Sequence, residues 1–243
     1  MFQSDAAYDN FMGRFSTKLA AVFVDFAGVS RGDAVLDVGA GTGALTAELV
    51  RRGVDAAAVE PSAGFVAALS QRFPAVEVRQ AGAELLPWPD EAFDAALAQL
   101  VVSFMSDAPA ALREMSRVVR PGGTVAVCMW DLHRMEMLAA IDRTRDALGA
   151  PREAGKYRTA GEMRELAGDA AEIELLEVDA DYRDFEDFWA ALAGGAGPAG
   201  QWAASLADEQ RTAARAELFR QLDEPEGPFA LTGRAWAARL TRA

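Results

Sequence analysis

Seven residues with three alternating glycines carry the strongest chemical signal in this chain of 243 residues. They read Asp37-Val38-Gly39-Ala40-Gly41-Thr42-Gly43 and lie where an apolar segment gives way to a helical pattern. Glycine lets the backbone turn tightly and approach a ligand with no side chain in between. N–H groups at the start of a helix bind anions such as a carboxylate. The pattern therefore predicts a ligand-binding turn between a first strand and a first helix.

A carboxylate at the end of the second apolar segment adds to this signal. Glu60 stands 23 residues after Asp37, and a carboxylate at that place accepts hydrogen bonds from ribose hydroxyls. The same features are typical of nicotinamide sites, because Gly39, Gly41 and Ala44 satisfy the relaxed form of their G-x-G-x-x-G pattern. The loop and the acid alone therefore leave an NAD(P)-dependent oxidoreductase open as an interpretation.

Short apolar segments alternate with helical patterns between residues 35 and 130, which is typical of βαβ units and a mainly parallel sheet. We expect strands over 35–38, 56–59, 76–78, 93–102 and 124–130, and helices over 44–52, after Ser62 and after Ser106 or Asp107. Several of these strands are rich in alanine, a poor strand former, so the order of elements carries the prediction. Beyond residue 130 we expect helices over 135–148, 159–167, 185–192 and 206–222, a glycine-rich loop over 194–200, and strands over 173–178 and 229–240.

Together these elements predict an α/β, Rossmann-like fold. Its sheet is expected to be mainly parallel and seven-stranded, with an antiparallel C-terminal edge pair and helical cap segments. The predicted organisation has an N-terminal helical cover over residues 1–34 and a cofactor-binding core over 35–130. Cap helices and C-terminal strands over 131–243 are expected to complete the same domain.

Composition and charge exclude several classes of partner. A net charge of −13 and a pI near 4.6 argue against nucleic acid, because tight binding to phosphates requires clustered Lys and Arg. The single cysteine, Cys128, has no partner for an internal disulfide, and the single histidine, His133, leaves no common zinc set, so we expect no metal. No run approaches the roughly 18 apolar residues that span a bilayer. We therefore expect a cytoplasmic protein with no membrane partner.

Four segments, taken in order, resemble the motifs of class I S-adenosylmethionine-dependent methyltransferases. The resemblance is to the methyltransferase type 11-like branch, which acts on quinones and other small molecules. The segments are VLDVGAGTGALT (35–46), AGAELLPWPD (81–90), FDAALAQLVVSFM (93–105) and LREMSRVVRPGG (112–123). They are similar to the family's first motif, its adenine loop, its fourth-strand motif, and the helix and turn before strand five. The segment YDNFMGRFS (8–16) is similar to the start of a bacterial group within that family.

The resemblance implies S-adenosyl-L-methionine as the cofactor and a small-molecule acceptor for its methyl group. The implied cofactor contacts are Arg14, Asp37, Gly39, Ala40, Gly41, Gly43, Glu60, Pro61, Gly82, Ala83, Glu84, Gln99 and Leu100. The glycine loop would hold the methionine part, Glu60 the ribose, and the Ala83 N–H the adenine. The family often has Asp where this chain has Gly82, so side-chain recognition of the adenine is in question. Arg14 would pair with the cofactor carboxylate, or it is a surface residue.

Methyl transfer from a sulfonium is an in-line displacement, which depends mostly on holding the reacting atoms collinear and excluding water. A base is needed only if the acceptor starts protonated. His133 is the titrating candidate for that base, with a structural role as the alternative. A binding module that keeps the cofactor pocket without catalysis remains a second interpretation. Nucleic-acid amino methyltransferases carry an Asn or Asp-Pro-Pro-aromatic sequence where this chain has Gln99-Leu100-Val101-Val102, which argues against a base as substrate.

Overall fold

The computed structural model describes residues 10–151, 159–195 and 197–243. Tyr8 and Asp9, and with them the start of the expected N-terminal cover, lie outside the described residues. The chain divides into two compact units. The first comprises described residues 19–130, 159–176 and 235–243, and the second comprises 10–18, 131–151, 177–195 and 197–234. One boundary between the units falls after residue 18 and another after residue 130.

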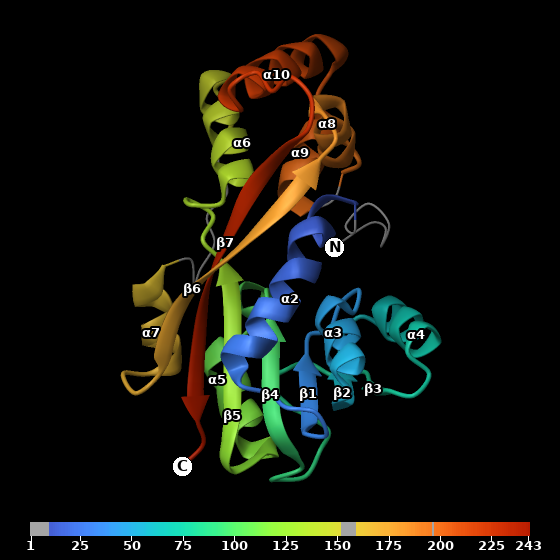
Figure 1. Ribbon diagram of the computed structural model, residues 1–243, viewed down its shortest axis with the longest axis vertical. Helices are drawn as coiled ribbons and strands as arrows, with labels where there is room; N and C mark the ends of the chain where they lie inside the picture. The colour runs from blue at the N-terminus through green and yellow to red at the C-terminus, as the bar shows by residue number, and fades with distance from the viewer. Residues whose placement is uncertain (1–9, 152–158, 196) are drawn as a thin grey trace. The chain divides into compact units, whose positions relative to one another are not determined.

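Seven strands form a single sheet in the order β3-β2-β1-β4-β5-β7-β6 (Figure 1). They are β1 (Ala34–Val38), β2 (Asp55–Val59), β3 (Glu77–Arg79), β4 (Phe93–Gln99), β5 (Val119–Trp130), β6 (Glu172–Tyr182) and β7 (Phe229–Thr241). Strands β1 to β5 pair in parallel, and β7 pairs antiparallel to β5. The predicted sheet with its antiparallel C-terminal strands is thus confirmed. The strand order reverses beside β1, and ligands of open α/β sheets bind at the carboxyl ends of strands at such a point.

Helices follow the parallel strands as predicted. The structure contains α2 (Gly13–Ala27), α3 (Ala44–Arg52), α4 (Ala63–Arg72), the 3₁₀ turn η1 (Val102–Phe104), α5 (Ala108–Val118), α6 (Glu136–Ala147), α7 (Ala160–Ala167), α8 (Phe185–Ala193), α9 (Gly197–Ser205) and α10 (Asp208–Gln221). Gly53 ends α3 in the left-handed region, with φ of 74°, and the Asp107 carboxylate caps α5 by accepting the N–H of Ala110. None of the helices in the described ranges has the length and apolar character that a membrane crossing requires.

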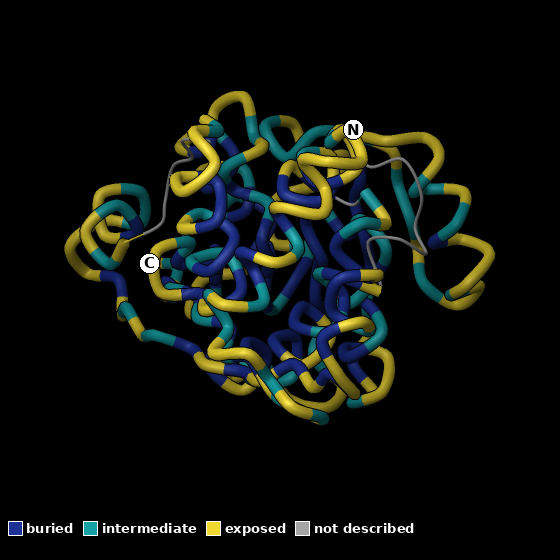
Figure 2. The backbone as a smooth tube through the Cα atoms, turned by 90° about the horizontal axis from the view of Figure 1, so that it is seen from above, coloured by how far each residue is buried: buried dark blue, intermediate teal, exposed yellow. Residues whose placement is uncertain are grey.

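Small strand residues build one side of the core. Buried alanines of β2 and β4 pack with Leu36 and Val38 of β1 and with side chains from α5 and α7. These helix residues are Leu112, Met115, Val118 and Met163. Figure 2 shows buried stretches of the chain in dark blue towards the inside, with exposed stretches in yellow around them. Burial between strands and helices, and not strand propensity, therefore explains the alanines of this sheet.

Strand β4 is shorter than predicted, because it ends at Gln99 and not at Val102. The next residue, Leu100, has φ of 63°, a left-handed conformation that a non-glycine residue adopts at a cost of about 1 kcal/mol. Its N–H donates to the carbonyl of Cys128 in β5 (2.9 Å), and the chain then turns into η1. Strand β4 therefore ends where the backbone turns at Leu100, and the apolar run over 100–102 gave no sign of it.

The prediction of an irregular loop over 194–200 is wrong, because α9 starts at Gly197. A buried arginine of α6 packs against its first turn: Arg145 Nη2 donates to the carbonyl of Pro198 (3.2 Å). The Arg145 guanidinium also lies over the Trp202 ring, 5.0 Å from its centroid. Proline suits the first turn of a helix, since it lacks the N–H that would have no partner there. Packing against α6 therefore offsets the low helix propensity of the glycines.

A buried carboxyl joins the first strand to the first helix. The Thr46 hydroxyl of α3 donates to Asp37 Oδ2 of β1 at 2.5 Å, and both residues are buried. Burial raises the pKa of Asp37 from its ordinary value of 3.8 to about 7. The hydrogen bonds from Thr46 oppose this rise, and the nearby Glu60 carboxylate adds to it.

We expect Asp37 to make the free energy of unfolding depend on pH. Its pKa is higher in the folded chain than in the unfolded chain, so the folded state binds the proton more tightly, and its stability falls as pH rises from about 4 to about 7. The loss reaches at most about 4 kcal/mol. In Asp37→Asn this contribution disappears. Chemical denaturation at several pH values should therefore show that the free energy of unfolding of the variant rises relative to that of the wild type as pH approaches 7. Thr46→Val should extend the loss to higher pH. A constant difference between Asp37→Asn and the wild type would contradict the assignment.

We also expect α9 to depend on Arg145. Arg145→Lys removes the donor to Pro198 and the planar contact with Trp202, so it should lower the free energy of unfolding by about 1 to 3 kcal/mol. Hydrogen exchange over 197–205 should become faster. The matched control is Arg143→Lys on the same helix, where the arginine is exposed and contacts Gln221. Equal protection of α9 in the two variants would show that Arg145 does not hold it.

Candidate functional site

The glycine loop lies between the carboxyl end of β1 and the start of α3, with all three glycines in the left-handed region. Their φ values are 75° at Gly39, 54° at Gly41 and 87° at Gly43. A Cβ on Gly39 would lie 3.0 Å from the Val101 side chain, and a Cβ on Gly43 would lie 2.7 Å from the Phe73 ring. A Cβ on Gly41 would meet only the carbonyl of Gly39, at 3.9 Å. The protein itself therefore excludes side chains at Gly39 and Gly43, whereas Gly41 faces open space.

Backbone hydrogen bonds fix the loop to the neighbouring strand. The N–H groups of Gly39 and Ala40 both donate to the carbonyl of Val59 at the end of β2, at 2.8 and 3.2 Å. The Gly43 N–H closes the turn by donating to the carbonyl of Ala40 (2.8 Å). The loop thus has one defined conformation before any ligand arrives, which lowers the entropy that binding must overcome.

Glu60 faces this loop, as the sequence predicted. Its carboxylate is buried, with 7% of the residue exposed, and Oε2 accepts the N–H of Gly41 at 3.1 Å. Oε1 accepts the N–H of Ser62 at 2.9 Å, and Ser62 directly precedes α4. Each carboxylate oxygen accepts two hydrogen bonds, so both retain capacity for a donor such as a ribose hydroxyl. The carbonyl of Pro61 accepts the Gln80 side-chain N–H (3.1 Å), which ties this turn to the end of β3.

The predicted adenine loop is anchored to α5 at both ends. Glu84 Oε1 accepts the N–H groups of Ser106 and Asp107, at 2.8 and 3.2 Å. The N–H of Leu86 donates to Glu114 Oε2 (2.9 Å), and Arg117 Nη2 donates to the Leu86 carbonyl (3.0 Å). Gly82, Ala83 and Glu84 are all half-buried, so Glu84 is held in place and is not a free surface residue.

Strand β4 ends at Gln99, and Leu100 follows it. The contact of Val101 with Gly39 places this strand end beside the glycine loop. Gln99 and Leu100 are both buried, and Leu100 has the strained backbone described above. Strain of this kind is common where backbone must be presented to a ligand. The structure therefore brings together the predicted residues of the first, second and fourth strands.

Asp37 and Cys128 have buried, internal positions. The partner of Asp37 is Thr46, whose role sequence reasoning missed although it lies within the motif segment 35–46. A hydroxyl nine residues after the acid is a weak signal in a sequence, since only the packing of α3 on β1 brings the two together. Cys128 lies buried within β5, and burial raises the pKa of its thiol, so it packs as a small apolar side chain.

Arg14 and His133 belong to the other unit, and each has its own surroundings there. The Arg14 guanidinium forms two hydrogen bonds with the Asp187 carboxylate, at 2.8 and 3.0 Å, and lies over the Tyr182 ring. It holds the pKa of Asp187 well below its usual range. The His133 side chain is exposed in the turn after β5, and the backbone N–H of His133 donates to Asp131 Oδ1 (3.1 Å). Contact of Arg14 with the cofactor and catalysis by His133 stay predictions, and Asp187 is a competing partner for Arg14.

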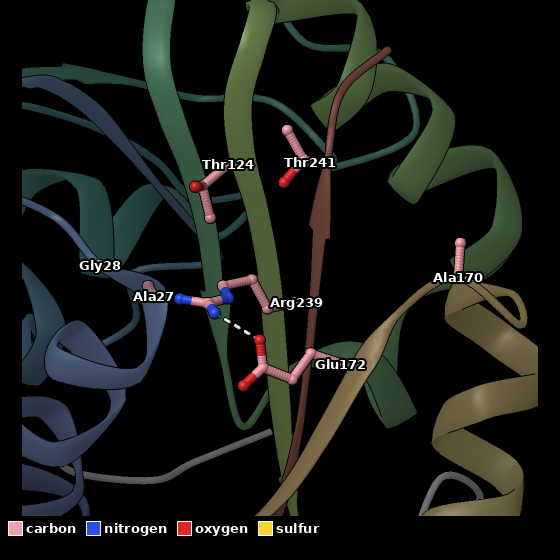
Figure 3. Close-up of a pocket in the computed structure, with 7 residues that line it drawn as sticks. All are labelled: Ala27, Gly28, Thr124, Ala170, Glu172, Arg239 and Thr241. Carbon is pink, nitrogen blue, oxygen red and sulfur yellow. Dashed lines mark hydrogen bonds and ion pairs between the residues drawn. The ribbon is translucent and has the colours of Figure 1, made fainter.

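A cavity of about 370 Å³ lies at the other end of the strands from the glycine loop (Figure 3). It is lined by Ala27, Gly28, Thr124, Ala170, Glu172, Arg239 and Thr241. Thr124 and Thr241 pair across β5 and β7 at the edge where the parallel strands begin. Arg239 forms an ion pair with Glu172 and donates to the carbonyl of Phe26 (2.8 Å). The cavity shares no lining residue with the glycine loop, so it is a separate feature of the fold.

The chain is similar in sequence to known methyltransferases. Residues 36–127 match the family model of a methyltransferase domain. A demethylmenaquinone methyltransferase of Mycolicibacterium paratuberculosis is 37% identical over 115 residues, which cover 47% of this chain and 49% of that protein. The demethylmenaquinone methyltransferase of Beutenbergia cavernae is 39% identical over 104 residues, 43% of each chain. The chain thus spans about half the length of the curated relatives it matches.

Solved structures share the fold across nearly the whole chain. A putative methyltransferase from an antibiotic biosynthesis pathway of Anabaena variabilis has a TM-score of 0.61 at 19% identity, covering 92% of this chain and 97% of its own. Geranyl diphosphate methyltransferase in complex with SAM has a TM-score of 0.53 at 16% identity, covering 95% and 87%. Together, the family match and the relatives show that residues 36–127 are similar to a methyltransferase domain.

Proposed function

We propose that the chain binds S-adenosyl-L-methionine at the glycine loop and transfers its methyl group to a small acceptor molecule. The observation that carries this proposal is the Glu60 carboxylate directed at the N–H of Gly41, beside the open face of that glycine. A ribose requires acceptors of this kind, and an amino acid requires bare backbone at a helix start. The residues present therefore fit the cofactor.

The strand order favours this function over an NAD(P)-dependent oxidoreductase. Nicotinamide-binding sheets commonly have the all-parallel order 3-2-1-4-5-6. Here the antiparallel β7 lies between β5 and β6. The methyltransferase family model matches residues 36–127, which include the glycine loop, and two of the relatives are named demethylmenaquinone methyltransferases, which supports the same conclusion.

The chemistry requires little from side chains. When bound, the cofactor would supply a transferable methyl group on a positively charged sulfur. The protein then contributes orientation and exclusion of water. The loop over 39–43 positions the methionine part, Glu60 the ribose, the Ala83 N–H the adenine, and the backbone at Gln99 and Leu100 the amino acid end.

A small acceptor in the cytoplasm agrees with the charge and cysteine content. The net charge of −13 opposes nucleic acid, and the names of the relatives specify demethylmenaquinone, a small molecule. The single cysteine suits a reducing compartment. Production of S-adenosylhomocysteine with a panel of quinone, phenol and amine acceptors tests catalysis, and binding without turnover of any acceptor would favour the binding module.

We expect Gly41→Asp to abolish cofactor binding, because the new carboxylate would enter the space that the ligand needs and would repel both Glu60 and the cofactor carboxylate. Calorimetry with S-adenosylhomocysteine measures this. The matched control is Gly32→Asp, a glycine with φ of 89° and open space around it that precedes β1 at the other end of the strand. The control should bind as the wild type does, and unchanged affinity in Gly41→Asp would refute the loop assignment.

Glu60→Ala should weaken binding of S-adenosylhomocysteine by about 1 to 3 kcal/mol, because two ribose hydroxyls lose their acceptor. Glu60 also braces Gly41, so a second ligand separates the two effects. The wild type should bind the 2′,3′-dideoxy analogue more weakly than the parent compound, and Glu60→Ala should bind the two alike. If the variant discriminates between them as strongly as the wild type, Glu60 does not contact the ribose.

A further inference from the structure

The adenine loop has no side chain at position 82, but a carboxylate from elsewhere in the loop fills the adjacent space. A Cβ built on Gly82 would lie 3.0 Å from Glu84 Oε2. The oxygens of an aspartate lie only two bonds beyond its Cβ. Glu84 therefore presents a carboxylate oxygen in the space that a side chain of residue 82 would enter.

Glu84 is fixed in this position through its other oxygen. Oε1 accepts two backbone N–H groups, from Ser106 and Asp107, immediately before α5 begins at Ala108. The positive end of a helix dipole favours a negative carboxylate there. Two donors on one oxygen determine the orientation of the whole group, so Oε2 stays directed towards Gly82.

The backbone around Glu84 is fixed as well. Leu86 is held through its N–H by Glu114 and through its carbonyl by Arg117, both on α5. Arg117 is in turn paired with Glu114 (2.8 Å). The Ala83 N–H and Glu84 Oε2 thus stand in a defined relation to each other, one a donor and the other an acceptor.

Adenine offers the complementary pair of groups along one edge, a ring nitrogen that accepts and a 6-amino group that donates. We propose that Glu84 Oε2 accepts a hydrogen bond from that 6-amino group and so determines the specificity for adenine over hypoxanthine, a role that rests on the proposed binding of the cofactor at this loop. A 6-oxo base would place its oxygen against a carboxylate. A site built to hydrogen-bond a group rejects the analogue that lacks it.

Calorimetry with S-adenosylhomocysteine and S-inosylhomocysteine tests this directly. The wild type should prefer the adenine compound by about tenfold or more. In Glu84→Gln the amide oxygen still accepts the N–H groups of Ser106 and Asp107, and its NH₂ group replaces Oε2 as a donor. The preference should fall by about fivefold or more, since one hydrogen bond is exchanged for an unfavourable contact. The part that remains reflects the N1–H of hypoxanthine, which opposes the Ala83 N–H in both proteins.

Two further variants exclude an indirect effect on the loop. Glu114→Gln loosens the same loop from the α5 side, so it should weaken both ligands alike and keep their ratio. The double variant Gly82→Asp with Glu84→Ala moves the carboxylate to position 82, and it should regain the preference for adenine. A thermal unfolding transition close to that of the wild type verifies that each variant is folded.

The outcomes separate this inference from the proposed function. If the wild type prefers S-adenosylhomocysteine and Glu84→Gln keeps the same preference, Glu84 does not read the base, while the cofactor site stands. If the wild type binds neither compound, both the function and this role are wrong. A preference that falls by about fivefold or more in Glu84→Gln, is retained in Glu114→Gln and is regained in the double variant supports the assignment.

Discussion

The hydrogen bond between the Gly41 N–H and the Glu60 carboxylate is the interaction on which the candidate site depends. It joins the loop after β1 to the turn after β2, so both strand ends face one place. A ligand needs bare backbone there, and Gly41 is the loop glycine whose missing Cβ faces open space. Glu60 thus has two effects, because it braces the loop and also presents acceptor oxygens to whatever binds.

A second buried carboxyl lies next to the same loop and is bonded to the protein's interior. Asp37 is buried and bonded to Thr46, and its raised pKa follows from burial and from the charge of Glu60 nearby. The loop therefore carries one acid that supports it from inside the protein and one that faces the site. Their mutual repulsion is tolerated because burial already favours the protonated form of Asp37.

In the second unit, two arginines connect segments that are far apart in the sequence. Arg14 is engaged by Asp187 and Tyr182, and Arg145 by Pro198 and Trp202. Each guanidinium binds an anion or a carbonyl and also lies over an aromatic ring, an arrangement that suits its planar shape. Such contacts hold segments that are distant in sequence, and a pattern of single residues does not reveal them.

The sequence by itself determined the order of the elements, the glycine loop and the acid after the second strand. These features are local: glycine spacing sets the turn, and hydrophobic periodicity sets the strands and helices around it. The expected strands β1, β2 and β5 and the helix α3 agree with the structure to within a few residues, and Glu60 lies where its position after β2 predicted.

Only the tertiary structure decided the end of β4, the helical state of 197–205 and the partners of Asp37, Glu84 and Arg14. Leu100 has a positive φ while its N–H continues the pairing of β4 with Cys128 of β5, and Arg145 of α6 donates to the first turn of α9. Each of these depends on a contact between residues remote in the chain, whose energy local propensity does not contain. The same reason explains Glu84, whose carboxylate is oriented by backbone N–H groups more than twenty residues away.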